Sequence, residues 1–141
     1  MKNVYKKIFF DTAPIIYLLE KKTEYYADIV SLLKTCKTSM LVSSAITIME
    51  YLTYPYRVGD TDSVNDFFDF LADYNFSISP IDESVAEKAA QIRAEHRIRS
   101  MDALQLAAAI QCGCDVFLTN DRRLRQFKAV PVLLVGGLQA S

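Results

Sequence analysis

The sequence predicts an α/β fold, a three-layer sandwich in which helices cover both faces of a parallel sheet. Short apolar runs bounded by polar residues alternate with segments of helical spacing. This alternation is typical of right-handed crossover units, which make neighbouring strands parallel. The runs are apolar throughout, as expected for strands that are buried on both faces.

The expected elements follow one another along the chain. Candidate strands are residues 8–10, 40–42, 76–81, 116–118 and 132–135. Helix starts are indicated by Thr12, with Pro14 just inside the helix, and by Ser44, Asp82 and Ser100, which precede residues 45–54, 83–96 and 101–111. Residues 61–75 predict an acidic amphipathic helix, and Pro55 and Gly113 supply two of the expected stops.

Length and composition limit the classes of function. A chain of 141 residues, 51% of them hydrophobic, fits one compact domain, and we expect residues 1–141 to form it. The formal net charge of −1 lacks the basic balance of many nucleic-acid binders, so any RNA contact must be local or metal-assisted.

Asp11 interrupts the first apolar run before a signal-peptide core could form, and no apolar stretch approaches the roughly 20 residues needed to span a bilayer. The three cysteines are an odd number without the usual zinc-motif spacing, which indicates reduced thiols. We therefore expect a cytoplasmic protein with no membrane contact.

Four carboxylates stand out because each is isolated in apolar sequence. Asp11 is the only charge between Lys7 and Glu20, Glu50 between Lys37 and Arg57, and Asp102 between Arg99 and Asp115, while Asp121 follows the fourth expected strand through Thr119 and Asn120. Open parallel sheets place their sites beyond the carboxyl ends of the strands. We therefore expect these acids to meet at that edge.

A cluster of this kind needs a cation. Two carboxylates about 4 Å apart repel by roughly 4 kcal/mol at an effective dielectric constant of 20. All-oxygen ligands favour hard ions such as Mg²⁺ or Mn²⁺ over zinc, and such an ion can promote phosphodiester hydrolysis. The alternative is structural: Asp11, Asp102 and Asp121 could each favour a helix start, although Glu50 has no obvious local cation.

Four segments carry these acids: IFFDTAPIIYLLE around Asp11, SAITIMEYL around Glu50, SMDALQLAAAI around Asp102 and FLTNDRRL around Asp121. They resemble the four acidic motifs of PIN-domain nucleases, in that family's order, and the resemblance runs from residue 8 to about residue 135. Many members are VapC-type toxin ribonucleases of toxin-antitoxin modules. The resemblance implies a five-stranded parallel sheet, dependence on Mg²⁺ or Mn²⁺, and endonucleolytic cleavage of RNA by the four acids as metal ligands.

Further residues take expected roles beside the acids. Thr119 matches a family position that often holds Ser or Thr, which implies that it positions a water or a carboxylate. Arg99, Arg122 and Arg123 flank the acids, and we expect them to contact RNA phosphates, with solvated helix faces as the alternative.

A toxin of this kind implies a small antitoxin. We expect its amphipathic helix between residues 46–54 and 61–75, where the aromatic side chains are Tyr51, Tyr54, Tyr56, Phe67 and Phe70. Internal packing of these rings, or a homodimer contact, is the alternative.

The sequence also leaves three alternative functions to consider. FFDTAP puts an aspartate after a first strand, as in phosphatase-type phosphotransfer domains, but such domains have a second aspartate where this chain has Ala13. A non-toxin PIN nuclease, or a PIN-like RNA-binding module without catalysis, would carry the same acids.

Overall fold

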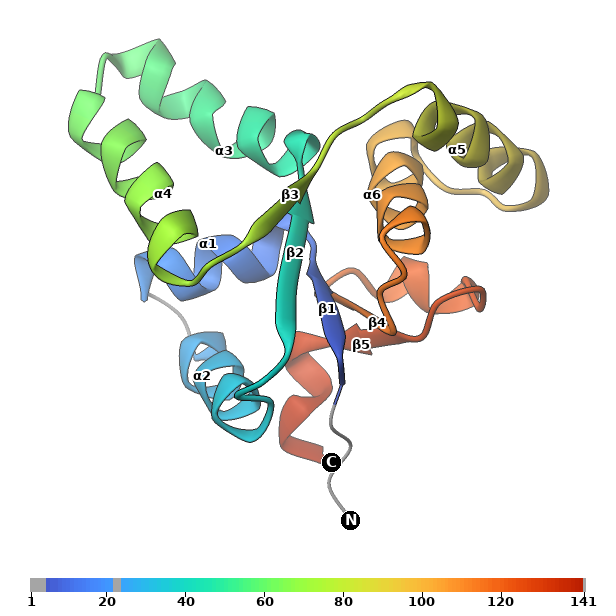
Figure 1. Ribbon diagram of the computed structural model, residues 1–141, viewed down its shortest axis with the longest axis horizontal. Helices are drawn as coiled ribbons and strands as arrows, with labels where there is room; N and C mark the ends of the chain where they lie inside the picture. Colours follow the sequence, from blue (N-terminus) through green and yellow to red (C-terminus); the bar gives the residue numbers. More distant parts are fainter. Residues whose placement is uncertain (1–4, 22–23, 141) are drawn as a thin grey trace.

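One parallel sheet of five strands, in the order β3-β2-β1-β4-β5, organises the chain (Figure 1). The strands are β1 (Lys7–Phe10), β2 (Met40–Ser44), β3 (Ser77–Ser79), β4 (Val116–Thr119) and β5 (Val132–Leu134). The computed structural model describes residues 5–21 and 24–140, without the side chains of 139 and 140. The predicted α/β class and the parallel five-stranded sheet are confirmed.

Helices connect the strands and cover both faces of the sheet. The α-helices are α1 (Thr12–Glu20), α2 (Tyr25–Thr35), α3 (Ala45–Val58), α4 (Thr61–Asp73), α5 (Glu83–Glu95) and α6 (Ser100–Gln111), and the 3₁₀ helices are η1 (Arg122–Gln126) and η2 (Val135–Ala140). Figure 1 shows α5 and α6 on one side of the sheet and α1 to α4 on the other. None of these helices, within the described part of the chain, is long and apolar enough to cross a membrane.

The central strand β1 contributes to both cores. Phe9 packs with α5 and α6 and stacks on Phe117 of β4 at a ring-centroid distance of 5.2 Å. Ile8 and Phe10 belong to the opposite core, under α1 to α4. Alternate side chains of a strand point to opposite faces, so Ile8, Phe9 and Phe10, which are buried on both sides of the sheet, are all apolar. The end of β1 is therefore fixed tightly in the molecule.

Helices start directly where strands end, at the carboxyl edge of the sheet. Asp11 follows β1 and accepts a hydrogen bond from the backbone N–H of Thr12, and Ser44 ends β2 and accepts one from Ile46. Asp121 caps η1 in the same way, through the N–H of Arg123. These caps satisfy backbone donors at helix starts and hold polar side chains along one edge.

Two local predictions were wrong or incomplete. Pro55 does not stop α3, which continues to Val58 and ends at Gly59, whose φ of 70° is left-handed. Pro55 removes one backbone hydrogen bond of the helix, and burial of its ring offsets part of that cost. Helix α2 was not predicted, and Glu24, the residue directly before it, makes no side-chain cap.

The expected aromatic surface between α3 and α4 is only partly present. Phe67 and Phe70 are buried, and Tyr51 stacks on Phe67 at 4.6 Å, so these rings belong to the core instead. The apolar stripe of α4 faces inward, as an amphipathic helix requires. Tyr54 and Tyr56 each keep 66% of their surface exposed. Met49, Val58 and Phe68 are exposed as well.

Candidate active site

Asp11 lies at the centre of the polar groups that gather at the carboxyl edge. Its Oδ1 accepts the backbone N–H of Thr12 at 2.9 Å, and its Oδ2 accepts the hydroxyl of Thr119 at 2.8 Å. Thr119 is the last residue of β4 and is buried. Neighbouring strands β1 and β4 thus bring an acid and a hydroxyl donor together, and the donor fixes the carboxylate.

A buried polar network supports this edge from below. The amide of Gln105 on α6 donates to the hydroxyl of Thr47 at 2.9 Å and lies 3.4 Å from Oδ1 of Asp11. Its carbonyl accepts the hydroxyl of Ser44, and the hydroxyl of Ser43 donates to Thr47 at 2.9 Å. Among described residues, no buried side-chain polar atom lacks a partner. A fully satisfied network fixes its members in one arrangement.

Glu50 reaches the same edge from α3. The hydroxyl of Thr12 donates to its Oε1 at 2.6 Å, and the Thr12 and Thr47 hydroxyls lie 3.2 Å apart. Glu50 is exposed, so it forms the solvent side of the cluster and Asp11 the inner side. Thr12 therefore links the two acids: its N–H binds Asp11 and its hydroxyl binds Glu50.

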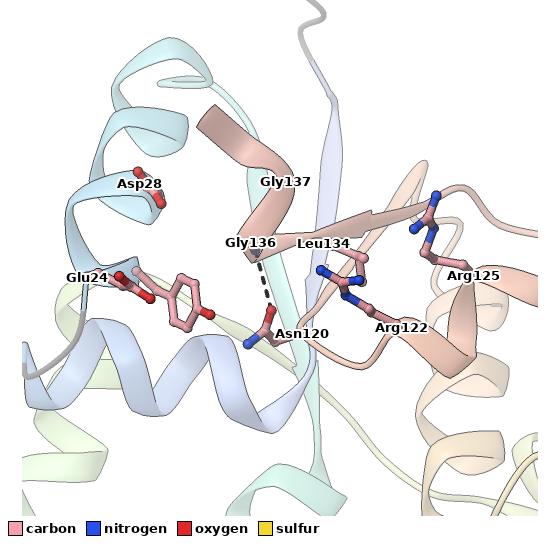
Figure 2. A pocket seen from close by; sticks show the side chains of 9 residues that line it. Glu24, Asp28, Asn120, Arg122, Arg125, Leu134, Gly136 and Gly137 are labelled. Carbon is pink, nitrogen blue, oxygen red and sulfur yellow. Dashed lines mark hydrogen bonds between the residues drawn. The ribbon is translucent and has the colours of Figure 1, made fainter. Parts of the chain in front are cut away.

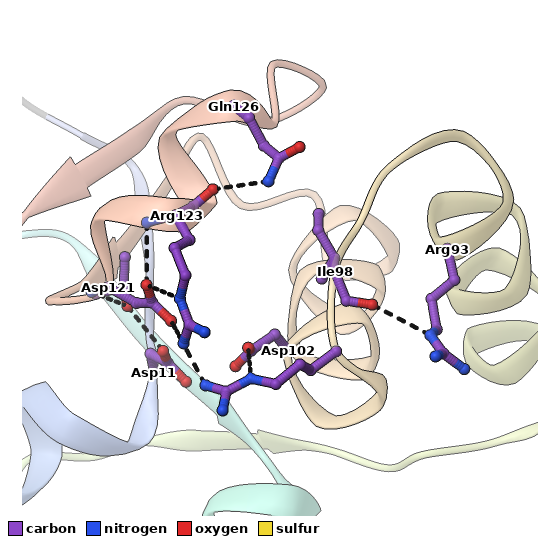
Figure 3. Close-up of polar contacts among 9 residues, drawn as sticks. Asp11, Arg93, Ile98, Asp102, Asp121, Arg123 and Gln126 are labelled. Atoms are coloured by element: carbon purple, nitrogen blue, oxygen red, sulfur yellow. Dashed lines mark hydrogen bonds and ion pairs between the residues drawn. The ribbon is translucent and has the colours of Figure 1, made fainter.

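Asp102 and Asp121 stand on the other side of Asp11, together with two arginines. Figure 3 shows Asp11, Asp102 and Asp121 facing one common space. The guanidinium of Arg99 lies 3.4 Å from Oδ2 of Asp102 and 3.8 Å from Oδ2 of Asp121. Arg123 binds Asp121 with two nitrogens, at 2.9 and 2.6 Å. These two cations neutralise the rim of the cluster.

The pKa values of two acids shift in opposite directions. Burial raises the pKa of Asp11 from 3.8 to about 6, and the negative charges of Asp102 and Glu50 add to this, while hydrogen bonds from Thr119 and Thr12 oppose it. The pKa of Asp121 is lowered, chiefly by the hydrogen bonds from the Arg123 side chain. Of these two acids, Asp11 is thus the one whose negative charge the protein compensates less.

The donor set suits a hard divalent cation, since it consists of carboxylate oxygens with hydroxyls beside them. Within residues 5–21 and 24–140, however, no three His, Cys, Asp or Glu side chains are arranged to hold one ion as they stand. As they stand, Asp102 is paired with Arg99 and Asp121 with Arg123. A cation would have to compete with these guanidinium groups for the same oxygens.

Comparison with known proteins identifies the family. The model of the PIN domain matches residues 8–130, most of the chain. The chain belongs to the PIN-domain family. No curated protein sequence matches it.

Solved structures share its fold. One is a chain of VapBC2 from Rickettsia felis, in a complex bound to a DNA fragment from the VapBC2 promoter. Its TM-score is 0.72 at 17% identity, and the match covers 91% of this chain and 98% of that one. FitAcB from Neisseria gonorrhoeae gives 0.70 at 24% identity, covering 92% and 98%. VapC20 of Mycobacterium tuberculosis, a sarcin-ricin loop cleaving toxin, gives 0.61 at 16% identity, covering 78% and 86%.

The site at the carboxyl edge of the sheet includes two residues that were not predicted from the sequence of this PIN domain. Thr12 was read only as a helix start, yet it binds both Asp11 and Glu50. Gln105 was not singled out at all. Its signal was available, because it is the one polar side chain in LQLAAAI of α6, three residues after Asp102 and so on the same side of the helix.

The three expected RNA-binding arginines separate into two groups. Arg99 and Arg123 contact the acids, as described above. Arg122 instead lines a cavity with Asn120 and Arg125 (Figure 2). The sequence places Arg122 and Arg123 side by side, whereas the helix η1 turns them to different surroundings.

Proposed function

We propose that this PIN domain is a metal-dependent endoribonuclease that hydrolyses RNA phosphodiester bonds. The observation that carries the proposal is the linked set of acids at the carboxyl edge, in which Thr12 and Thr119 orient Asp11 and Glu50. Such a set needs a partner of opposite charge, because Asp11 is largely desolvated. A divalent metal at an RNA phosphate meets this need, and PIN nucleases use divalent metals.

The proposed ligands are Asp11, Glu50, Asp102 and Asp121, with Mg²⁺ or Mn²⁺ as the ion. When bound, such an ion supplies Lewis-acid activation of water and of the phosphoryl oxygen. Thr119 keeps Oδ2 of Asp11 in a fixed direction, and Thr12 does the same for Oε1 of Glu50. Positioning of this kind lowers the cost of organising the site when substrate arrives.

Arg99 and Arg123 provide positive charge at the rim of the site. Both side chains are well exposed, at 70% and 61% of their full accessible surface, so an RNA backbone can reach them. A phosphate beside the acids would repel them, and two guanidinium groups offset this repulsion. We infer that these arginines bind the carboxylates in the free protein. When RNA and metal bind, the arginines would bind the RNA phosphate and the released carboxylates would bind the metal.

We further propose that the nuclease is the toxin of a toxin-antitoxin module. The support is the fold shared with chains of VapBC and FitAcB complexes, together with an exposed apolar surface on α3 and α4. That surface consists of Met49, Tyr54, Tyr56, Val58 and Phe68. Its proposed occupant is an amphipathic antitoxin helix, and a homodimer contact is the alternative.

The decisive experiment measures RNA cleavage with Mg²⁺, Mn²⁺ or EDTA, on the wild type and on Asp11→Asn. Cleavage that needs the ion and is lost in the variant, with circular dichroism unchanged, supports the nuclease. RNA binding without cleavage under all three conditions would leave an RNA-binding module.

A second experiment tests the toxin. The chain is expressed alone and with the product of an adjacent small open reading frame, and growth and complex formation are measured. Harmless expression of an active enzyme with no co-purifying neighbour would leave a PIN nuclease outside such modules.

A further inference from the structure

A cavity of about 500 Å³ lies between α2, η1 and the start of η2, where β5 ends. Its walls include Glu24, Tyr25 and Asp28 from the start of α2, and Arg122 and Arg125 from η1 (Figure 2). Asn120, directly before Asp121, lies at its base and accepts the N–H of Gly136 at 3.4 Å. Because Asn120 lines the cavity and the next residue, Asp121, belongs to the acidic site, the two sites are adjacent along the chain.

The geometry of η1 explains why neighbouring residues serve two sites. In a 3₁₀ helix the side chains at positions i and i+3 lie above one another. Arg122 and Arg125 thus share the side that lines the cavity, while Arg123 turns to Asp121. A ligand bound across this segment would meet the acids on one side and the arginine pair on the other.

The cavity offers three kinds of contact. Arg122 and Arg125 supply positive charge, Glu24 and Asp28 supply carboxylate acceptors opposite them, and Tyr25 adds an aromatic ring to the lining. The Tyr25 ring packs at 5.0 Å from Tyr17, whose hydroxyl accepts a hydrogen bond from Asn120. A nucleotide has matching parts: a phosphate for arginine, a flat face for an aromatic ring, and amino or imino donors for a carboxylate.

We propose that this cavity binds one unpaired nucleotide of the RNA, next to the bond that is cut at the acidic site. The inference rests on the proposed nuclease function and adds a subsite to it. The phosphate meets Arg122 and Arg125, the base lies on Tyr25, and its donor edge faces Glu24 and Asp28. Bases with an amino or imino donor, above all guanine, fit the acidic wall better than bases without one.

Removal of charge gives the first test. Single-stranded RNA of randomised sequence is bound to the full chain in EDTA, where cleavage does not occur, over a range of salt concentrations. Arg122→Ala and Arg125→Ala should each raise Kd about fivefold, as for loss of one exposed ion pair. Each should also reduce the slope of log K against log salt by about 0.7. Lys88→Ala, which removes an exposed charge from α5, is the matched control.

Filling the cavity gives the second test, without any change of charge. A Cβ added at Gly136 would lie 3.5 Å from Oδ1 of Asn120 and 3.8 Å from a Tyr25 ring carbon, both ordinary contacts. Gly136→Ala should therefore be tolerated, whereas Gly136→Leu should occupy the cavity. With Mn²⁺ and a randomised RNA pool, sequencing of the products should show a base preference beside the cut that Gly136→Leu loses and Gly136→Ala keeps.

The two tests separate the subsite from the nuclease. Unchanged Kd and salt slope in both arginine variants, or an unchanged base preference in Gly136→Leu, would overturn the subsite even if the wild type cleaves RNA. If the wild type binds RNA through Arg122 and Arg125 but cleaves none with any metal, the nuclease proposal fails while the cavity still binds RNA.

Discussion

The ends of strands β1 and β4 are alike in sequence and differ in electrostatics. Each strand is followed closely by an aspartate that caps a helix, and Thr119 contacts both, through the carboxylate of Asp11 and the backbone N–H of Asp121. Asp11 is enclosed by hydroxyl and amide donors, and its pKa rises to about 6. Asp121 stands at the rim between two guanidinium groups, and its pKa falls.

This difference shows that position in the fold does not fix the charge of an acid. A parallel sheet brings both aspartates to one edge, but burial and the arginines decide which of them still needs a cation. Asp11 is the inner acid, and the protein compensates its charge less than that of Asp121. Asp121 is an outer acid already paired. We therefore expect variants at the β1 end to have larger effects than variants at the β4 end.

The largest effect should be on catalysis by Asp11→Asn. Even residues that only support a metal ligand cost roughly 10- to 100-fold when changed, so loss of the inner ligand should exceed about 100-fold in the rate of RNA cleavage. The rate with Mn²⁺ on a randomised RNA pool measures this, with Asp69→Asn on the exposed side of α4 as the control. Asp102→Asn should also lose cleavage without unfolding, and full activity in either site variant would reject the assignment.

The same variant should be more stable than the wild type in metal-free buffer. A carboxyl whose pKa rises from 3.8 to about 6 on folding holds its proton more tightly when folded. The loss of folding stability that ionised Asp11 causes is therefore absent below pH 4. It grows as the pH rises to 6 and is complete above pH 6. A rise of about 2 pKa units corresponds to about 3 kcal/mol at pH 7, which Asp11→Asn should recover.

Urea unfolding in EDTA at pH 4 and pH 7 measures this gain. The difference between Asp11→Asn and the wild type should be close to zero at pH 4 and several kcal/mol at pH 7. Mn²⁺ should stabilise the wild type more than the variant. A variant that is less stable than the wild type at pH 7 would show that the Asp11 carboxylate is already compensated.

Loss of the hydroxyl at Thr119 should have an intermediate effect. Thr119→Val keeps the buried shape but removes the donor to Oδ2 of Asp11 and the acceptor for the N–H of Asp121. We expect RNA cleavage to fall about tenfold, mainly through weaker Mn²⁺ activation, as for other residues that orient a metal ligand. Thr119→Ser, which keeps the hydroxyl, should restore it. Equal activity of the Val and Ser variants would reject a positioning role.

The elements that the sequence predicted share a physical reason. Apolar runs and cap residues are local signals, and they gave the five strands and the helix starts at Ser44 and Asp82. Isolation in apolar sequence was enough to single out Asp11 and Glu50. Helix α2 was not predicted because no side chain caps its start. Pro55 was wrongly predicted to stop a helix, although α3 continues through it to Val58.

The surroundings of each acid are long-range and could not be predicted in this way. Gln105 contacts Asp11 across 94 positions of sequence, and Thr119 contacts it across 108. The different surroundings of Arg122 and Arg123 depend on the 3₁₀ form of η1, which the run of arginines does not reveal. The roles of the four acids stay a prediction until variants are measured.

The smallest effect should come from Arg123→Ala, and it tests the outer half of the comparison. Arg123 binds Asp121 through two nitrogens, so it competes with any cation for those oxygens. Its removal should tighten Mn²⁺ binding about threefold in the absence of RNA, since an exposed ion pair contributes little. Arg122→Ala removes the same charge one residue away, from a side chain that lines the cavity, and should change Mn²⁺ affinity less. Titration calorimetry without RNA measures both variants. Equal effects would mean that net charge alone sets the Mn²⁺ affinity. Weaker Mn²⁺ binding in Arg123→Ala would show that Arg123 supports Asp121 as a metal ligand instead of competing with the metal for it.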